Sequence, residues 1–335
     1  MIFLSIIIPV RNEEKFIETT LNQLINQDYP KERYELLVVD GMSEDGTRRI
    51  IREISERYPD VTLKLLDNPK HLSSFARNIG AKQAKGEIVA VIDGHVFIPD
   101  KLLFHSIERI VEEKQALVLS RPAPLDVPGL ENGKPFWIAI SRKTWLGHSG
   151  KSHIYGEFEG FVDPVSSGFA YHKSIFEKIG YFDENFDAAE DVEFHFRIKK
   201  SGLLAYTSPL LLIYSYPRST FLDLFKQQTR YGEGRVRFIK KFPEAFTIET
   251  LIPIGVFLFF LLFPLLFVSY VPWFVKIVWI VSFLMYIGIL STTGIIEALK
   301  REKILPFLWV ASGILVTHLG LGWGILKACF KSWNK

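Results

Sequence analysis

The sequence predicts an α/β domain followed by a C-terminal α-helical transmembrane region, and two observations lead to this prediction. Residues 1–120 alternate between apolar runs and amphipathic segments, as in a parallel sheet covered by helices. Towards the C-terminus, three windows carry no acidic or basic residue: Thr250–Val275, Ile277–Ile296 and Ile304–Leu326. Each window can cross a hydrocarbon core of ~30 Å at ~1.5 Å per helical residue. The pattern therefore argues against a freely soluble protein.

Five apolar runs predict the strands of the sheet: Phe3–Val10, Glu35–Asp40, Val61–Leu66, Glu87–Asp93 and Ala116–Leu119. Helical periodicity between them predicts helices near residues 13–27, 44–58, 72–85 and 100–113. Open sheets of this kind bind ligands beyond the carboxyl ends of their strands. We therefore expect a binding site in the turns that follow these strands.

The second half of the α/β part is less regular. Ten prolines and glycines within residues 121–160 predict a long loop of the kind that compact domains keep for function. Residues 161–215 return to an α/β pattern, with a helix predicted near 189–200 and a strand over 203–207. A basic amphipathic helix is predicted near residues 218–241.

The charge is unevenly distributed along the chain, although the net charge is only +3. Residues 1–217 hold 31 acidic and 26 basic side chains, whereas residues 218–241 hold seven basic and two acidic ones. A basic block before the first apolar window suits the anionic cytoplasmic face of a membrane. The acidic first part argues against nucleic-acid binding. We divide the chain into an α/β domain (1–217), a basic juxtamembrane region (218–249) and a membrane domain (250–335).

The membrane domain contains two or three transmembrane helices. Spans over about 251–270 and 273–296 place Lys300, Arg301 and Lys303 in the cytoplasm, as the positive-inside rule prefers. A third span over 304–326 would place Lys327, Lys331 and Lys335 outside, which the rule disfavours. A re-entrant or interfacial segment is the alternative. Both readings stay open at this point.

Cysteine content and the N-terminal sequence bear on the cellular compartment of the α/β domain. The single cysteine, Cys329, excludes a framework of disulfides and fits a reducing compartment. The N-terminus enters a strand pattern without the features of a signal peptide. We therefore expect a multi-pass protein of the cell membrane with its α/β domain in the cytoplasm. The oligomeric state is left open.

Polar residues follow three of the predicted strands. The segment Pro9-Val10-Arg11-Asn12-Glu13 follows the first strand, and Asp40 ends the second, where its carboxylate can accept hydrogen bonds from a base or ribose. The alternative for the second turn is local capping of the next helix. Asp93-Gly94-His95 ends the fourth strand. Side chains two apart on an extended segment point to one side, so Asp93 and His95 can converge on Mn²⁺ or Mg²⁺; a plain polar turn is the alternative.

Two further segments carry chemistry of their own. Glu190 and Asp191 stand at the start of a predicted helix. A carboxylate there can act as the general base for an acceptor hydroxyl, and the alternative is that both only interact favourably with the helix dipole. The segment that contains Gln227, Arg230, Tyr231 and Arg235 combines an amide, an aromatic ring and guanidinium groups that suit phosphate and sugar. A plain amphipathic helix on a membrane surface is the alternative.

Together these segments resemble the family 2 inverting glycosyltransferases of GT-A fold. The resemblance covers roughly residues 4–98 and 161–240 and is carried by the strings IIIPVRNEE, VVDGMSEDGT, SSFARNIGAKQAKGEIVAVIDGHVF, GYFDENFDAAEDVEFHFRIKKSG and QQTRYGEGR. Within the family, the chain is most similar to the membrane-bound exopolysaccharide glucosyltransferases of the succinoglycan type. There the metal motif also reads Asp-x-His, and Arg-Tyr-Gly-x-Gly-Arg precedes the apolar tail. The resemblance implies a Rossmann-like, mainly parallel mixed sheet.

The resemblance also implies roles for the matching positions. The nucleotide-sugar site would comprise Pro9, Val10, Arg11, Glu13, Asp40, Arg77, Asp93 and Gly94. Asp93 and His95 would face the metal, and Asp191 would be the catalytic base with Glu190 beside it. The acceptor and diphosphate site would comprise Gln227, Arg230, Tyr231 and Arg235.

The implied reaction is the inverting transfer of a hexose from a nucleotide sugar, with a UDP-sugar favoured, to a lipid-linked polyprenyl glycan. One base and one cation, Mn²⁺ or Mg²⁺, suffice for this single displacement. Tyr231 replaces the Trp of processive synthases and His95 replaces a second Asp, so both argue against polymer extrusion. The alternatives are a synthase of polyprenyl-phosphate monosaccharides and an inactive, membrane-tethered binder of nucleotide sugars.

Overall fold

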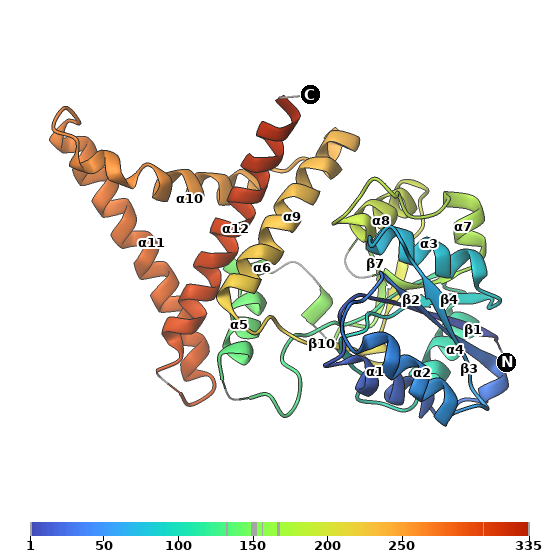
Figure 1. The fold of residues 1–335 in the computed structure, drawn as a ribbon. Helices are drawn as coiled ribbons and strands as arrows, with labels where there is room; N and C mark the ends of the chain where they lie inside the picture. Colours follow the sequence, from blue (N-terminus) through green and yellow to red (C-terminus); the bar gives the residue numbers. More distant parts are fainter. Residues whose placement is uncertain are drawn as a thin grey trace. The chain divides into compact units, whose positions relative to one another are not determined.

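The computed structural model describes residues 2–131, 133–148, 153–155, 157–165, 168–303 and 305–333. The chain forms two compact units (Figure 1). The first comprises Met1–Val127 and Ser152–Tyr216, and the second comprises Pro128–Lys151 and Pro217–Lys335. The division of the sequence into three parts stays a prediction.

The first unit is built on an eight-stranded sheet with the strand order β3-β2-β1-β4-β8-β6-β9-β7. β1 (Leu4–Val10) lies between β2 (Tyr34–Asp40) and β4 (Ile88–Val91) and is parallel to both. β3 (Thr62–Asp67) extends this parallel half beyond β2. The carboxyl ends of these strands therefore meet at one edge of the sheet.

The other half of the sheet is mixed. β8 (Gly168–His172) runs antiparallel to β4 and to β6 (Val118–Ser120). β9 (Ala205–Thr207) is parallel to β6, and β7 (Gly160–Val162) is antiparallel to β9. The predicted mixed sheet with mainly parallel character is confirmed. A separate two-stranded sheet pairs β5 (Val96–Phe97) with β10 (Tyr214–Ser215).

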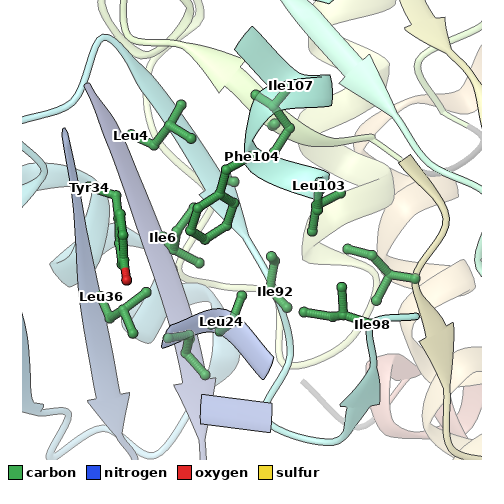
Figure 2. Close-up of a cluster of buried hydrophobic side chains, with 14 of the residues drawn as sticks. Leu4, Ile6, Leu24, Tyr34, Leu36, Ile92, Ile98, Leu103, Phe104 and Ile107 are labelled. Atoms are coloured by element: carbon green, nitrogen blue, oxygen red, sulfur yellow. The ribbon is translucent and has the colours of Figure 1, made fainter. Parts of the chain in front are cut away.

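Helices cover both faces of the large sheet, because successive side chains of a strand point to opposite faces. In β1, Ile6 and Ile8 join one buried cluster, while Ile7 joins the other. Figure 2 shows part of the first cluster, in which Ile6 lies near Phe104 and Leu24. The helices that contribute to the first cluster are α1 (Ile17–Ile25), α2 (Thr47–Arg57) and α4 (Leu103–Lys114). Those that contribute to the second are α3 (Ser73–Gln83), α7 (Ser174–Ile179) and α8 (Glu190–Lys200).

The second unit is helical throughout its long segments. Its main helices are α5 (Lys134–Lys143), α6 (Trp145–His148), α9 (Phe221–Lys241), α10 (Leu251–Leu261), α11 (Trp273–Leu299) and α12 (Phe307–Trp333). Among the described residues, three segments are long and apolar enough to cross a membrane: Ile248–Phe267, Trp273–Leu299 and Phe307–Phe330. They overlap the three predicted windows, of which Ile304 lies outside the described residues.

The prediction of a loop over residues 121–160 is wrong over α5 and α6. Pro135 sits in the first turn of α5, where a missing amide hydrogen costs nothing. The helix buries Phe136, Trp137 and Ile140 in a cluster with side chains of α11 and α12. Those partners are distant in sequence, so the local pattern did not show that this segment would be buried. Its prolines and glycines therefore led to the prediction of a loop. Residues 132, 149–152 and 156 of the predicted loop lie outside the described residues.

A buried carboxylate ties the amino-terminal ends of the parallel strands together. Glu35 of β2 is fully buried and accepts hydrogen bonds from Ser5 Oγ (2.8 Å) and from the backbone N–H of Lys85 (2.7 Å). Lys64 Nζ of β3 lies 3.1 Å from its other oxygen. Burial raises the pKa of Glu35, but the three donors together lower it by more than burial raises it. The pKa therefore lies below its usual 4.5.

We predict that Glu35→Gln destabilises the protein by about 1–3 kcal/mol at neutral pH, because charge-assisted hydrogen bonds are lost. The lowered pKa stabilises the fold above the pKa of the unfolded state, and this contribution disappears as the pH falls through the folded pKa. The gap between the two proteins should therefore close in acid. Thermal unfolding of the full chain in detergent between pH 3 and 7 measures this. Glu53→Gln, in an exposed pair with Arg49, is the control. A gap that does not vary with pH would contradict the prediction.

Candidate functional site

The loops that follow β1 and β2 are bound to each other at the carboxyl edge of the sheet. The backbone N–H of Asn12 donates to Ser43 Oγ (2.8 Å), and its side-chain oxygen accepts from the N–H of Glu44 (2.9 Å). The N–H of Glu13 donates to Thr47 Oγ1 (2.8 Å). The two predicted binding segments are therefore one structural element.

Three residues of this edge have left-handed backbone conformations that side chains other than Gly rarely adopt. They are Asn12 (φ 56°), Met42 (φ 56°) and His71 (φ 62°), one after each of β1, β2 and β3. His71 Nδ1 lies 2.8 Å from the carbonyl oxygen of Gly41, so the third loop is joined to the second. Strained backbone of this kind persists only where surrounding bonds hold it, and it is typical of binding sites.

Asp40 ends β2 and is fully buried. Its carboxylate accepts from the N–H of Ser43 (3.0 Å) and from Arg48 Nη1 (2.6 Å), and Arg48 Nη2 reaches Asp67 at the end of β3 (2.8 Å). Asp40 thus holds its own turn against the neighbouring strand. Its predicted contact with a nucleoside stays a prediction.

The turn after β4 brings Asp93 and His95 to the loop after β1. The side chain of Asp93 is 39 % exposed. His95 Nδ1 lies 2.9 Å from Glu13 Oε1. Between them, a Cβ on Gly94 would lie 2.6 Å from Val10 Cγ1, so this turn can approach β1 only without a side chain at position 94. Of the other residues predicted here, Pro9 lies in β1 and Arg11 is exposed in the loop.

One face of α3 binds the segment that leads to α8. Ser74 Oγ donates to the carbonyl oxygen of Phe186 (2.9 Å). Asn78 forms two bonds with the backbone of Phe182, each 2.9 Å long. Residues at positions i, i+3 and i+4 share one face of a helix, and this places Arg77 on the face with Ser74 and Asn78.

Arg77 is the residue that joins the predicted catalytic segments. Its Nη2 lies 3.4 Å from Glu190 Oε1 and 4.0 Å from Asp93 Oδ1. The guanidinium is 12 % exposed, and the Glu190 side chain is 8 % exposed. Burial lowers the pKa of Arg77, but the charges of Glu190, Asp191 and Asp93 raise it more, so the group is always charged. The structure therefore brings together Arg77, Asp93, Glu190 and Asp191.

Asp191 differs from its neighbour Glu190 in its surroundings. It is half-buried, and its Oδ1 accepts from the N–H of Val192 (2.8 Å). Ala189, just before the helix, has a left-handed φ of 65°, which sets the direction in which α8 begins. The helix is then held by the buried Glu193, which binds Arg197 through both oxygens (2.7 and 3.0 Å).

Three buried residues near this cluster were not predicted. Tyr171 and His195 form a hydrogen bond of 2.6 Å, and burial, with a smaller effect of Arg77, lowers the pKa of His195 to about 3. The ring is therefore neutral, and the Tyr171 hydroxyl and His195 Nε2 share this hydrogen bond. Arg121 follows β6, is buried and donates to the carbonyl oxygen of Ile213 (2.9 Å). A charged residue directly after an apolar strand was the signal for Arg121, whereas nothing in the sequence separates His195 from a surface histidine.

The remaining predicted residues lie on α9, in the second unit. Gln227 and Tyr231, one helical turn apart, share a side-chain hydrogen bond of 3.3 Å. Tyr231 is 44 % exposed, and Arg230 and Arg235 are exposed as well. The opposite face of α9 is buried. Binding of an acceptor or diphosphate by these four residues stays a prediction.

Within the described residues, no three His, Cys, Asp or Glu side chains are placed to hold a metal ion together. Asp93 and His95 are thus the two candidates on this edge of the sheet. A cation bound there would take further ligands from a bound molecule, which hard oxygen-seeking ions do with phosphates.

Comparisons with known proteins concern the family and the fold of the chain. Residues 5–180 match the family described as Glycosyl transferase family 2, and residues 132–326 match Glycosyl transferase family group 2. A relative from Methanococcus voltae is 34 % identical over 267 residues, which are 78 % of this chain and 81 % of the relative. It is named dolichyl N-acetyl-alpha-D-glucosaminyl phosphate 3-beta-D-2,3-diacetamido-2,3-dideoxy-beta-D-glucuronosyltransferase.

Two other proteins share much of the chain. The succinoglycan biosynthesis protein ExoA from Rhizobium meliloti is 28 % identical over 254 residues, 75 % of this chain and 74 % of that protein. The solved structure of the mannosyltransferase PcManGT from Pyrobaculum calidifontis, in complex with GDP-Man and Mn²⁺, has a TM-score of 0.59. It covers 100 % of this chain and 88 % of the other at 19 % identity, a similarity that concerns the fold.

We predict strong coupling between Arg77 and Glu190. Removing one partner strands a buried charge and should cost about 3–5 kcal/mol, and removing both should cost less than the sum of the two single changes. Unfolding of Arg77→Met, Glu190→Gln and the double variant measures the coupling. The exposed pair Arg49–Glu53 is the control and should couple by less than about 0.5 kcal/mol. Additive effects at Arg77 and Glu190 would show that the pair is not a unit.

Proposed function

Since the chain belongs to glycosyltransferase family 2 and is a glycosyltransferase, we propose that it transfers a hexose from a nucleotide sugar to a lipid-linked glycan. The family resemblance predicted from the sequence is confirmed. The observation that carries the proposal is the placement of Asp93, Glu190 and Asp191 around the buried guanidinium of Arg77. The name of the Methanococcus relative, which includes a dolichyl-linked acceptor, supports a lipid carrier, and we retain a UDP-sugar as the favoured donor.

In the proposed mechanism, Asp191 is the general base. Glu190 is buried and its Oε1 lies 3.4 Å from Arg77 Nη2, so this carboxylate is engaged in an ion pair and turned away from solvent. Asp191 is more open and takes the proton of the acceptor hydroxyl. The hydroxyl oxygen attacks the anomeric carbon as the bond to the nucleoside diphosphate breaks, so the configuration inverts. Glu190 is a positioning residue that holds Arg77 beside the base.

The residues at the end of β4 fit a divalent cation such as Mn²⁺ or Mg²⁺. Asp93 is accessible, and a carboxylate and an imidazole two residues apart in one turn suit such an ion. Asp93 and His95 would hold the ion. When bound, it would neutralise charge on the departing diphosphate. The Mn²⁺ in the mannosyltransferase structure supports this assignment.

The membrane location is part of the proposal. Three segments are apolar and long enough to span a bilayer, and a basic helix precedes the first of them. We place the protein in the cell membrane as a multi-pass protein, with its catalytic unit in the cytoplasm. Such an anchor keeps the catalytic unit close to an acceptor that diffuses in the same membrane.

We predict that Asp191→Asn lowers the transfer rate by about 10²–10⁴-fold, the usual contribution of a general base. Donor affinity should not change, because the amide keeps the shape of the carboxylate. Transfer of radiolabelled sugar to membrane lipid and equilibrium binding of the donor measure the two quantities. Glu177→Gln, on the exposed face of α7, is the control. Wild-type turnover in Asp191→Asn would exclude this base.

We also predict that donor binding depends on a cation held by Asp93. Chelation with EDTA should weaken binding of the nucleoside diphosphate, and added Mn²⁺ should restore it. In Asp93→Asn the restoration should need much more Mn²⁺, as followed by calorimetry of nucleotide binding and by the electron paramagnetic resonance signal of Mn²⁺. Asp60→Asn, at an exposed position, serves as the control. Equal Mn²⁺ requirements in both variants would refute the site.

The product distinguishes the remaining candidates. A donor screen with membranes and Mn²⁺, followed by thin-layer chromatography and mass analysis of the labelled lipid, identifies donor and acceptor. A lengthened diphosphate glycan supports the proposal, whereas one sugar on a polyprenyl monophosphate supports the synthase alternative. The name of the Methanococcus relative, whose acceptor is a sugar on a dolichyl phosphate, favours the lengthening of an existing lipid-linked glycan over the synthase alternative. Hydrolysis of the donor without acceptor would exclude an inactive binding protein.

A further inference from the structure

We propose that α12 lies in the membrane interface with α5 and α9, and that only the segments Ile248–Phe267 and Trp273–Leu299 cross the bilayer. Hydropathy alone does not separate these three candidates. The inference rests on the membrane placement proposed above and on no part of the chemistry. It concerns the surface of the second unit that meets lipid.

The three apolar segments differ sharply in how much protein covers them. None of the most apolar window of Ile248–Phe267 is buried and only 6 % of that of Trp273–Leu299, whereas 50 % of the window in Phe307–Phe330 is buried. A span surrounded by lipid leaves its side chains uncovered by protein. The first two segments have this property, and α12 does not.

The C-terminal half of α12 packs closely on α9 (Figure 1). A Cβ added to Gly320 would lie 2.7 Å from Gln228 Cβ, and one on Gly324 would overlap the backbone of Thr229. One turn further, Lys327 forms an ion pair with Glu233. The helices are therefore in contact along a stretch that includes charged residues.

The N-terminal half of α12 is covered by α5 and α6. Val310 and Ile314 are fully buried in the cluster that contains Trp137. His318 Nε2 lies 3.0 Å from the carbonyl oxygen of Leu146, which fixes the helix to α6. α12 also packs against α10 and α11, with Tyr286 Oη and His318 Nδ1 2.7 Å apart, so protein covers it on several sides, unlike the other two apolar segments.

Charge decides between the two placements. If α12 crossed the bilayer, its residues 320–327 would carry residues 225–233 of α9 into the hydrocarbon, including the exposed Lys226 and Arg230. A charged side chain at the centre of a membrane helix is strongly unfavourable, because it leaves water for hydrocarbon. In the interface, the same side chains meet water and anionic headgroups.

The proposed placement also determines the side on which the chain ends. α9 precedes the first crossing segment, so α12, bound to α9, lies on the cytoplasmic side after two crossings. Lys327 and the last two lysines, Lys331 and Lys335, then obey the positive-inside rule, which three crossings would violate. The preference for an interfacial segment over a third span thus follows from packing and charge together.

The single native cysteine makes a direct test possible. Cys329 is exposed near the end of α12 and is first replaced by Ser, which leaves a chain without thiols. Lys335→Cys then reports on the C-terminus, and Ser269→Cys reports on the exposed segment between α10 and α11. Each full-length variant is treated with a membrane-impermeant maleimide in spheroplasts and in inverted membrane vesicles.

The expected result is opposite labelling of the two reporters. Position 269 should react in spheroplasts, and position 335 should react only in inverted vesicles. Reaction of both positions in spheroplasts would show three crossings and overturn the inference, while leaving the proposed reaction untouched. Release of the protein by alkaline carbonate would overturn the membrane placement itself, for the inference and for the proposed function alike. Loss of transfer activity alone would bear only on the reaction.

Discussion

The buried guanidinium of Arg77 is the group on which the catalytic unit depends. A charge removed from water must be compensated by partners of opposite charge, and Arg77 finds them on two other elements, Asp93 after β4 and Glu190 at the start of α8. Neither partner can move away without leaving a charge stranded. The ion pairs therefore make α3, the sheet edge and α8 behave as one body, with Asp191 carried along in a defined position.

Neutral hydrogen-bonding groups hold the rest of this edge of the sheet in place. Ser74 and Asn78 hold the segment before α8 through its backbone, so that Arg77 meets its carboxylates without further adjustment. Left-handed Asn12 and Met42 shape the loops that follow β1 and β2. Strain of this kind costs free energy, which the hydrogen bonds between the loops offset. A site that is rigid before substrate arrives wastes little binding energy on its own reorganisation.

Much of this arrangement was predictable, because its signals are local or belong to a family pattern. Strands of β-branched residues, helices of period 3.6 and the motifs around Asp93 and Asp191 all lie within short stretches. The buried partners were not predictable. The sequence around His195 is typical of a surface residue on a charged helix, and only burial beside Tyr171 of β8 makes it a neutral, hydrogen-bonded ring. The helix α5 was mistaken for a loop because the side chains that bury it come from residues about 150 positions later.

By itself, the sequence determined the α/β class, the order of the strands along the chain, the membrane-directed tail and the residue types of a sugar-nucleotide transferase. These depend on periodicity, composition and short motifs, which are properties of neighbouring residues. Only the tertiary structure decided that Glu190 forms an ion pair with Arg77 whereas Asp191 is more exposed. It also decided that α12 packs against α5 and α9. Burial and charge pairing depend on neighbours in space, so two adjacent carboxylates, or three helices that are each apolar enough to span a membrane, can differ in surroundings once the chain is folded.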